Sequence, residues 1–260
     1  MKAFLIREHE FFGRYLELNP LGAEKICSFD CAYCNLGASN TKLSDLKKFE
    51  GFPSLHELMA EFRKILGGSM SPTGRELKTL VLSGNGEPTM YPDFRGLVSE
   101  LAKTRQELMA NDLQVVCFTN GDTLSDNAIV GALNSLDQTY LKIDYGSERA
   151  FKKFNRPRTR TTLEKIIQGA KSLKNLSVQT TVLGGDASLD SPARLDEWLE
   201  VIAMLSPNEV VLTLGQPPFR ELEQAASGLT VATEDDLHRL SHWLDRRLKI
   251  KARVGFSVAA

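Results

Sequence analysis

Three of the chain's four cysteines lie between Cys27 and Cys34, spaced as Cys-x3-Cys-x2-Cys. Thiolates are soft ligands that bind zinc or iron-sulfur clusters. A structural zinc site takes four protein ligands, and the local count here stops at three. The spacing therefore indicates a cluster with one metal corner left open. An open metal position is typical of a catalytic site.

Two other interpretations stay open for these thiols. A distant residue could complete a zinc site, although neither His9 nor His56 lies close to the cysteines in the sequence. The three residues could also be reduced structural cysteines. Cys117 lies inside the apolar run Val115 to Phe118, and we expect it to be a buried core residue.

The overall charge excludes a global field that would attract nucleic acid or a membrane, because 32 basic residues face 33 acidic ones. A site for a polyanion must therefore be local. No apolar stretch approaches a membrane span, and the N-terminal apolar run is too short for a signal peptide. We expect a cytoplasmic protein, where bunched thiols serve as metal ligands.

The elements that position the cysteines alternate between short apolar runs and amphipathic stretches. Strands are predicted at 15–18, 79–83, 114–119, 140–144, 177–183, 209–214 and 251–256, and helices at 55–66, 93–109, 124–136, 162–173, 192–205 and 234–248. Such alternation requires a parallel sheet with right-handed crossovers. About six strand-helix units are fewer than the eight of a closed barrel. We predict an α/β fold, a partial (β/α)6 TIM-type barrel with outer helices, as a single domain over 1–260.

Ligands gather at the carboxyl ends of the strands in such sheets. The cysteine loop follows the first predicted strand, and Gly84-Asn85-Gly86-Glu87-Pro88 follows the second. The two glycines would let backbone groups approach a ligand closely, and Glu87 with Pro88 would set a rigid turn. Polar residues also follow or lie within the later strands: Asn120, Asp144, Gln179 and Gln216.

Together the two motifs resemble the radical S-adenosylmethionine (SAM) superfamily. In that family three cysteines bind a [4Fe-4S] cluster, and the amino and carboxylate groups of SAM chelate the fourth iron. The resemblance implies that Cys27, Cys31 and Cys34 are the iron ligands, that the loop from Gly84 to Pro88 holds the SAM amino group, and that Tyr33 contacts adenine. It also implies cofactor contacts from Asn120, Asp144, Gln179 and Gln216.

The chemistry implied by the resemblance is that of an enzyme. The reduced cluster cleaves SAM reductively, and the resulting 5'-deoxyadenosyl radical abstracts hydrogen from a substrate. The protein binds and orients the reactants and keeps water away. The open side of a partial barrel suits a large substrate. A one-electron reductant such as flavodoxin or ferredoxin is the implied partner.

Three stretches are similar to the branch that includes the wyosine-type tRNA synthetases, which build a tricyclic base from a methylguanine and pyruvate. They are the cysteine loop, Ser83 to Thr89, and Leu141 to Gly146 together with Phe154 to Pro157. Those synthetases carry a second cluster on additional cysteines, whereas only Cys117 is left here. The leading hypothesis is a radical SAM enzyme acting on a large substrate, with tRNA as the candidate. The alternatives are an activase that installs a glycyl radical on a partner protein, and a non-catalytic metal-binding regulator.

Lys142 and Asp144 are expected on the same side of their strand, because side chains two residues apart share a face. A buried Lys-Asp pair is costly and is a candidate for function. We predict that Lys142 is a catalytic residue that contacts the carboxylate of SAM or of the substrate. A structural ion pair is the alternative.

A dense basic run, Lys152 to Arg160, lies near the predicted site. It could bind the phosphates of RNA or of a phosphorylated substrate, with Phe154 as a stacking surface. A solvated loop is the alternative interpretation. His238 and His242 share a face of the last predicted helix, where we expect a polar exposed surface rather than a metal site.

Overall fold

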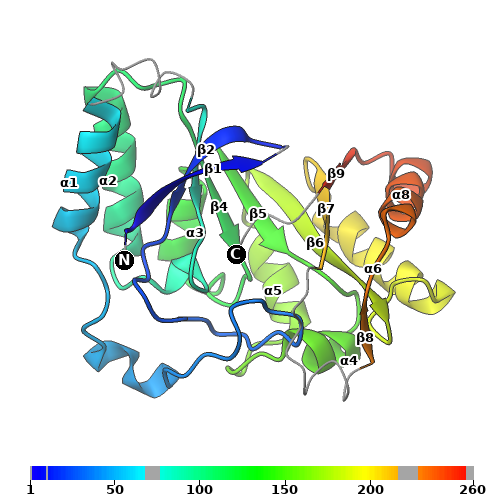
Figure 1. Cartoon of the computed structure of the whole chain (residues 1–260). Helices are drawn as coiled ribbons and strands as arrows, with labels where there is room; N and C mark the ends of the chain where they lie inside the picture. Colours follow the sequence, from blue (N-terminus) through cyan, green and yellow to red (C-terminus); the bar gives the residue numbers. More distant parts are fainter. Residues whose placement is uncertain (1, 10, 68–76, 216–227, 256–260) are drawn as a thin grey trace.

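The computed structural model describes residues 2–9, 11–67, 77–215 and 228–255. Within these ranges one curled sheet of nine strands runs in the order β1-β2-β3-β4-β5-β6-β7-β9, with β8 paired to β6. Strands β2 to β7 and β9 run parallel to one another. The sheet forms a half-barrel with helices outside it, which confirms the predicted fold class (Figure 1).

The parallel strands follow the predicted alternation closely. They are β2 Gly13–Leu18, β3 Thr79–Leu82, β4 Gln114–Thr119, β5 Gln138–Lys142, β6 Leu176–Gly185, β7 Val210–Leu214 and β9 Ala252–Gly255. Two antiparallel strands, β1 Phe4–His9 and β8 Leu229–Val231, were not expected. All four residues of β3 are buried, as in a parallel sheet covered on both faces.

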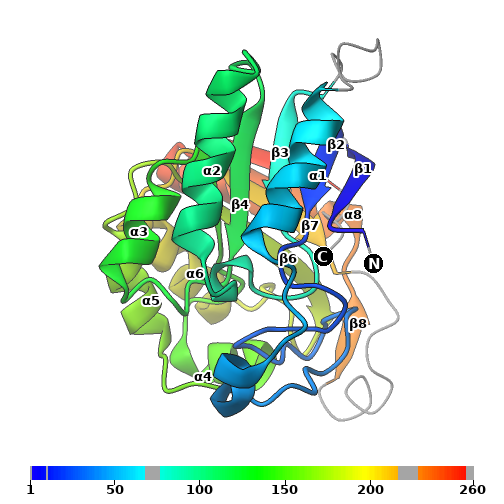
Figure 2. The same cartoon turned by 90° about the vertical axis from the view of Figure 1, so that its left-hand side faces the viewer.

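The helices cover the convex face of the sheet, with α1 and α2 side by side in Figure 2. They are α1 Leu55–Gly67, α2 Phe94–Glu107, α3 Asn127–Leu133, α4 Glu148–Ala150, α5 Leu163–Ala170, α6 Pro192–Leu205 and α8 Glu234–Trp243. Short 3₁₀ turns occur at η1 Leu43–Lys48 and η3 Pro88–Met90, and π-helical turns extend α4 through η4 Phe151–Asn155 and α8 through η5 Leu244–Leu248. None of the described helices is long and apolar enough to cross a membrane.

Side-chain caps set several helix starts where the sequence shows them. The Thr233 and Asp236 side chains form a reciprocal capping box at the start of α8. Ser191 caps α6, and Asp126 caps α3 through the backbone N-H of Ala128. Because Asp126 is the cap, α3 begins after the predicted start. The main apolar core lies between these helices and the sheet. The single domain over 1–260 stays a prediction.

A second apolar cluster fills the concave side of the half-barrel, where the tip of the β1-β2 hairpin inserts aromatic side chains. The ring of Phe12 makes edge contacts with Phe118 and Tyr140, which stack on each other with centroids 4.7 Å apart. Across the open side, the Arg253 guanidinium lies 4.6 Å from the Phe11 ring centroid and donates to the Phe11 carbonyl at 2.9 Å. The hairpin therefore closes the amino-terminal end of the barrel against β9.

Candidate active site

One cavity brings together the cysteine loop and the loop after β3. Both loops follow the carboxyl ends of parallel strands. In Figure 1 the blue loop after β2 lies at the lower end of the half-barrel, where α4 also lies. Of the residues predicted for the site, those lining the cavity are Cys27, Cys31, Tyr33, Cys34, Gly84, Gly86, Glu87, Pro88, Asn120, Lys142 and Gln179. The sheet thus gathers ligands that lie far apart in the sequence.

Two predicted residues are placed away from the cavity lining, and a third lies outside the described residues. Asp144 is buried behind Tyr33, and among the described residues it is not part of the cavity lining. The side chain of Asn85 donates to the carbonyl of Gly22 at 2.9 Å and so holds the preceding loop. Gln216 lies outside the described residues. Cofactor contacts from these three residues stay predictions.

The cysteine loop is held by the backbone of the segment 154–158. The Asp30 N-H donates to the Arg156 carbonyl at 3.0 Å, and the Ala32 N-H donates to the Phe154 carbonyl at 2.8 Å. In return the Arg158 N-H donates to the Ser28 carbonyl at 2.8 Å. The segment therefore acts as an extra strand that fixes the cysteine loop, a role that the sequence did not reveal.

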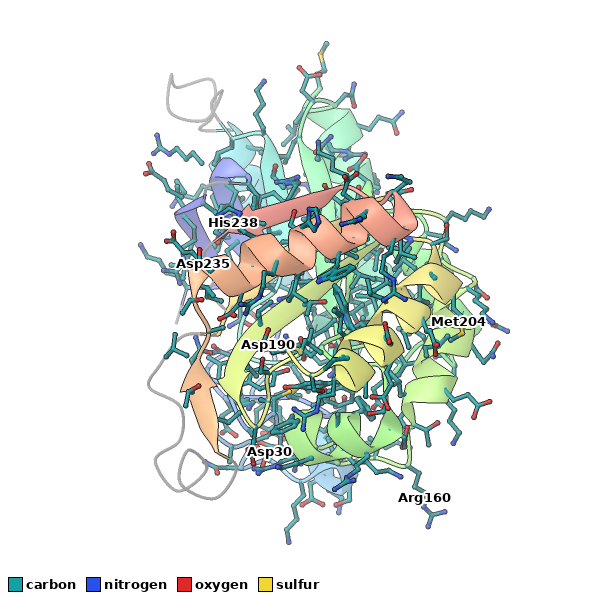
Figure 3. The ribbon with its side chains drawn as sticks, turned by 90° about the vertical axis from the view of Figure 1, so that its right-hand side faces the viewer. Asp30, Arg160, Asp190, Met204, Asp235 and His238 are labelled. Atoms are coloured by element: carbon teal, nitrogen blue, oxygen red, sulfur yellow. The ribbon has the colours of Figure 1, made fainter. Side chains whose placement is uncertain are left out.

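Several cations of the basic run 152–160 already bind other groups of the protein. Lys152 pairs with Glu148 and Lys153 with Asp186, while the Arg158 guanidinium donates to the carbonyls of Cys27 at 3.1 Å and Thr41 at 2.8 Å. Among the described residues, none forms an ion pair with Arg160, which projects outward in Figure 3.

Phe154 does not form the stacking surface that was one interpretation of this segment. Its side chain is fully buried and stacks on Tyr145 with ring centroids 5.0 Å apart. An aromatic ring packed into the core on this side cannot also receive a base. His238, in contrast, lies on the exposed face of α8, far from Asp30 of the cysteine loop in Figure 3, as expected for a polar surface.

The loop after β3 needs its glycines because its own chain crowds them. Gly86 has a φ of +133°, and a Cβ atom there would lie 1.9 Å from the Ile26 carbonyl oxygen. That carbonyl accepts the Glu87 N-H at 2.8 Å, and the Ile26 N-H donates to the Asn85 carbonyl at 2.9 Å. At Gly84, with a φ of +109°, a Cβ would meet the side chain of Asn19 at 2.4 Å. The glycines thus let this loop pair directly with the residue that precedes Cys27.

Replacing Gly86 with alanine should detach the two loops. The left-handed φ alone costs about 1–3 kcal/mol for a non-glycine residue, and the clash with Ile26 adds to it. We expect a loss of unfolding free energy of at least about 2 kcal/mol in chemical denaturation. Gly131→Ala is the control, because a Cβ there meets no atom within 4 Å and should change stability by less than about 1 kcal/mol. Equal stability of the two variants would contradict this account.

The Glu87 carboxylate points into the protein and joins the loops after β3 and β4. It accepts hydrogen bonds from the Thr89 hydroxyl at 2.6 Å, the Thr119 hydroxyl at 2.8 Å and the Asn120 N-H at 2.6 Å. Burial raises the pKa of Glu87 above its usual value, and these donors oppose that rise. The Asn120 amide in turn donates to the Ser28 hydroxyl at 3.1 Å. Glu87 therefore positions Asn120 against the cysteine loop.

Asp144 is the centre of a buried polar network. It accepts hydrogen bonds from the hydroxyl of Tyr33, from the Asn155 amide at 2.7 Å and from the Thr181 N-H at 2.8 Å. Burial and the nearby Asp144 carboxylate raise the pKa of Tyr33 well above its usual value, so its hydroxyl keeps the proton that it donates. This network fixes the ring of Tyr33 at the wall of the cavity.

Lys142 lies on the same side as Asp144, as expected, and their charged atoms are 3.3 Å apart. The Lys142 ammonium also donates to Gln179 Oε1 at 3.2 Å and lies 5.2 Å from the centroid of the Tyr33 ring. It keeps 22% of its side chain exposed and faces the cavity. Lys142 can therefore offer a positive charge to a bound anion while Asp144 holds it in place.

A comparison with protein-family models matches residues 25–199 to the model described as the radical SAM superfamily. The matched range contains the cysteine loop, the loop after β3 and the Lys142 wall of the cavity. The chain belongs to the radical SAM superfamily. It is therefore a radical SAM enzyme, and its cofactors are a [4Fe-4S] cluster and SAM.

Several curated proteins and solved structures are similar to this chain. A UPF0026 protein of Synechocystis sp. is 29% identical over 82% of this chain and 76% of its own length. Four further curated relatives are longer, and the chain spans between 28% and 61% of them. The structure of TYW1 with a lysine-pyruvate adduct has a TM-score of 0.59 at 16% identity, covering 89% of this chain and 73% of TYW1. The structure of anSMEcpe with bound AdoMet has a TM-score of 0.63 at 15% identity, covering 91% of this chain and 61% of the anSMEcpe chain. At these identities the two structures show the fold.

The donor set of this radical SAM site, three cysteine thiols at one cavity, is of the kind that holds an iron-sulfur cluster. In the described part of the chain, no three His, Cys, Asp or Glu side chains converge closely enough to hold one metal ion. A [4Fe-4S] cluster does not require such convergence, because each thiolate binds a different iron. Burial raises the pKa of Cys27 to about 12 and that of Cys31 to about 11, so a metal that bound these thiols would have to displace their protons.

Sequence reasoning missed two side chains that contact the thiols of this radical SAM site. The Asn155 amide lies 3.9 Å from Cys31 Sγ and 2.8 Å from the Tyr33 hydroxyl. The Lys25 ammonium lies 3.1 Å from Cys34 Sγ. Asn155 lies in the stretch from Phe154 to Pro157, and the family resemblance of that stretch could have indicated a role for it. Lys25 gave no signal beyond its nearness to Cys27 in the sequence.

Proposed function

We propose that Cys27, Cys31 and Cys34 hold the [4Fe-4S] cluster, and that the loop from Gly84 to Pro88 holds SAM beside it. When bound, these cofactors supply the electron transfer and carbon-sulfur cleavage that yield a radical able to remove hydrogen from a substrate. One observation carries the proposal. A single cavity is lined by the three thiols, the loop from Gly84 to Pro88 and Lys142, although these groups lie on or after different strands.

The chain's own residues would bind and orient the reactants. Lys142 carries the positive charge for a carboxylate of SAM or of the substrate, and Gln179 next to it supports the ammonium. Tyr33, fixed by Asp144, offers a ring at the cavity wall. The stacked rings of Phe118 and Tyr140 form an apolar part of the lining, which keeps water from the reacting groups.

We further propose a large substrate and favour RNA. The basic segment 152–160 lies beside the cysteine loop, so phosphates that bound it would be close to the cavity mouth. The resemblance of three sequence stretches to the wyosine-type tRNA synthetases supports this direction. The contacts that Lys152, Lys153 and Arg158 already make limit the free charge, however, and within the described residues Arg160 has no ion pair. We therefore expect modest affinity for RNA rather than tight nonspecific binding.

Anaerobic reconstitution tests the cofactor assignment. We expect about four irons per chain and release of 5'-deoxyadenosine when dithionite and SAM are added. The iron is measured chemically, and the nucleoside is measured by chromatography. Tightly held zinc with no cleavage of SAM would overturn the assignment and favour a metal-binding regulator.

A separate experiment tests the RNA substrate. Bulk tRNA should bind the reconstituted protein with an affinity that falls as salt is raised, because phosphate contacts release counterions. Arg160→Ala should weaken this binding, and Lys249→Ala, at the end of η5, is a control of equal charge. If tRNA neither binds nor changes 5'-deoxyadenosine formation, the RNA proposal fails while the cofactor assignment stands. Stable capture of a partner protein would instead favour an activase.

A further inference from the structure

The three proposed iron ligands receive hydrogen bonds of different kinds. Cys27 Sγ accepts from the Phe29 N-H at 3.4 Å and from the Asn120 amide at 3.7 Å. Cys31 Sγ accepts from the Asn155 amide at 3.9 Å. These donors are neutral. Cys34 Sγ instead accepts from the Lys25 ammonium at 3.1 Å, the shortest of these contacts and one made by a full positive charge.

Lys25 is held in this position from both ends. Its backbone carbonyl accepts the Ser39 hydroxyl at 2.7 Å, and its ammonium also donates to the Gly37 carbonyl. Within the described ranges no carboxylate forms an ion pair with Lys25. The side chain also lines the cavity that contains the thiols. The ammonium is thus fixed beside one sulfur rather than free in solvent.

A fixed cation beside a thiolate affects the energy of any cluster bound there. Reduction adds an electron to the cluster, and a nearby positive charge stabilises the more negative state. Hydrogen bonds to the sulfurs and the local charge are among the factors that set iron-sulfur reduction potentials. A bond from a charged donor is also stronger than one from a neutral amide. The donor to Cys34 should therefore outweigh those to Cys27 and Cys31.

We propose that Lys25 is a positioning residue that raises the reduction potential of the cluster through Cys34. This inference rests on the proposed role of Cys34 as an iron ligand. It goes beyond that role, since it assigns to a residue outside the cysteine motif the control of how readily the enzyme accepts its electron. A higher potential lets a weaker one-electron donor reduce the cluster.

A redox titration of the reconstituted protein tests this inference, with the reduced cluster followed by electron paramagnetic resonance in the absence of SAM. Lys25→Met removes the charge at similar length, and we expect its midpoint potential to be more negative than that of the wild type. Lys25→Arg keeps the charge and should stay close to the wild type. Lys42→Met is the matched control, because Lys42 is an exposed lysine that follows the cysteines. Its potential should not move.

Iron content measured on the same samples separates a change of potential from a loss of cluster. If Lys25→Met takes up no iron, Lys25→Gln, which keeps a neutral donor, replaces it in the comparison. An unchanged potential in the variant that holds a cluster overturns the inference, and so does an equal shift in Lys42→Met. A wild-type protein that assembles no cluster would instead refute the proposed function, so the two failures are distinguishable.

Discussion

Replacing Cys27, Cys31 or Cys34 with alanine is expected to abolish cluster assembly and SAM cleavage. Each thiolate would bind a different iron, so losing one opens a second corner of the cluster. Iron content should fall from about four per chain to background, and the broad iron-sulfur absorbance should vanish. Both are measured after anaerobic reconstitution.

Cys117→Ala is the matched control for the three cysteine variants. Cys117 lies in β4 with no exposed surface, and burial raises the pKa of its thiol well above the usual value. Among the described residues Cys117 is not part of the cavity lining, so its thiol is not placed to bind a cluster held there. The substitution should cost about 1 kcal/mol of stability as a small core truncation and leave iron content unchanged. Absorbance that persists in all three ligand variants, or vanishes in Cys117→Ala, would defeat the ligand assignment.

Replacing Asp144 with alanine should cause a large loss of stability. The carboxylate has no exposed surface and accepts bonds from Tyr33, Asn155 and Thr181, besides its ion pair with Lys142. Removing one partner of a buried pair costs about 3–5 kcal/mol. Because Lys142 is 22% exposed and can reach water, we expect about 3 kcal/mol, measured by chemical denaturation of the metal-free protein.

Two further variants show whether this effect belongs to the buried network. Asp144→Asn keeps an oxygen for the Thr181 N-H but loses the charge, so its cost should be about 1–2 kcal/mol. Asp190→Ala removes an exposed ion pair with Arg239 and should cost less than about 1 kcal/mol. If Asp144→Ala were no more destabilising than Asp190→Ala, Asp144 would not support the Tyr33 wall.

The strand-helix alternation was predictable because most strands are buried on both faces. The segment Thr79–Leu82 shows this as an unbroken apolar run. Strand β1 was missed for the opposite reason. It lies at the edge of the sheet with Leu5 37% and Ile6 49% exposed, so burial leaves no alternating pattern in its sequence. The short β8 pairs only with the extended end of β6, a contact that no local pattern encodes.

The site divides in the same way between local and distant contacts. The three cysteines lie within one short stretch of sequence, and so do the residues of the loop from Gly84 to Pro88. Both motifs could therefore be recognised from the sequence. The contacts of Asn155 with Cys31 and of Tyr33 with Asp144 join residues 124 and 111 positions apart, and they depend on how the strands pack. The sequence also shows that glycine is needed at Gly86, but not that the Ile26 carbonyl occupies the space.

The contact between the hairpin tip and β9 also constrains how the chain folds during synthesis. Phe11 and Arg253 are 242 residues apart, so the amino-terminal end of the barrel can close only after nearly all of the described chain has left the ribosome. Until then the contacts between Phe11 and Arg253 cannot form. Long-range closure of this kind is slow and leaves apolar surface exposed. We therefore expect closure of this end of the barrel to be a late step of folding.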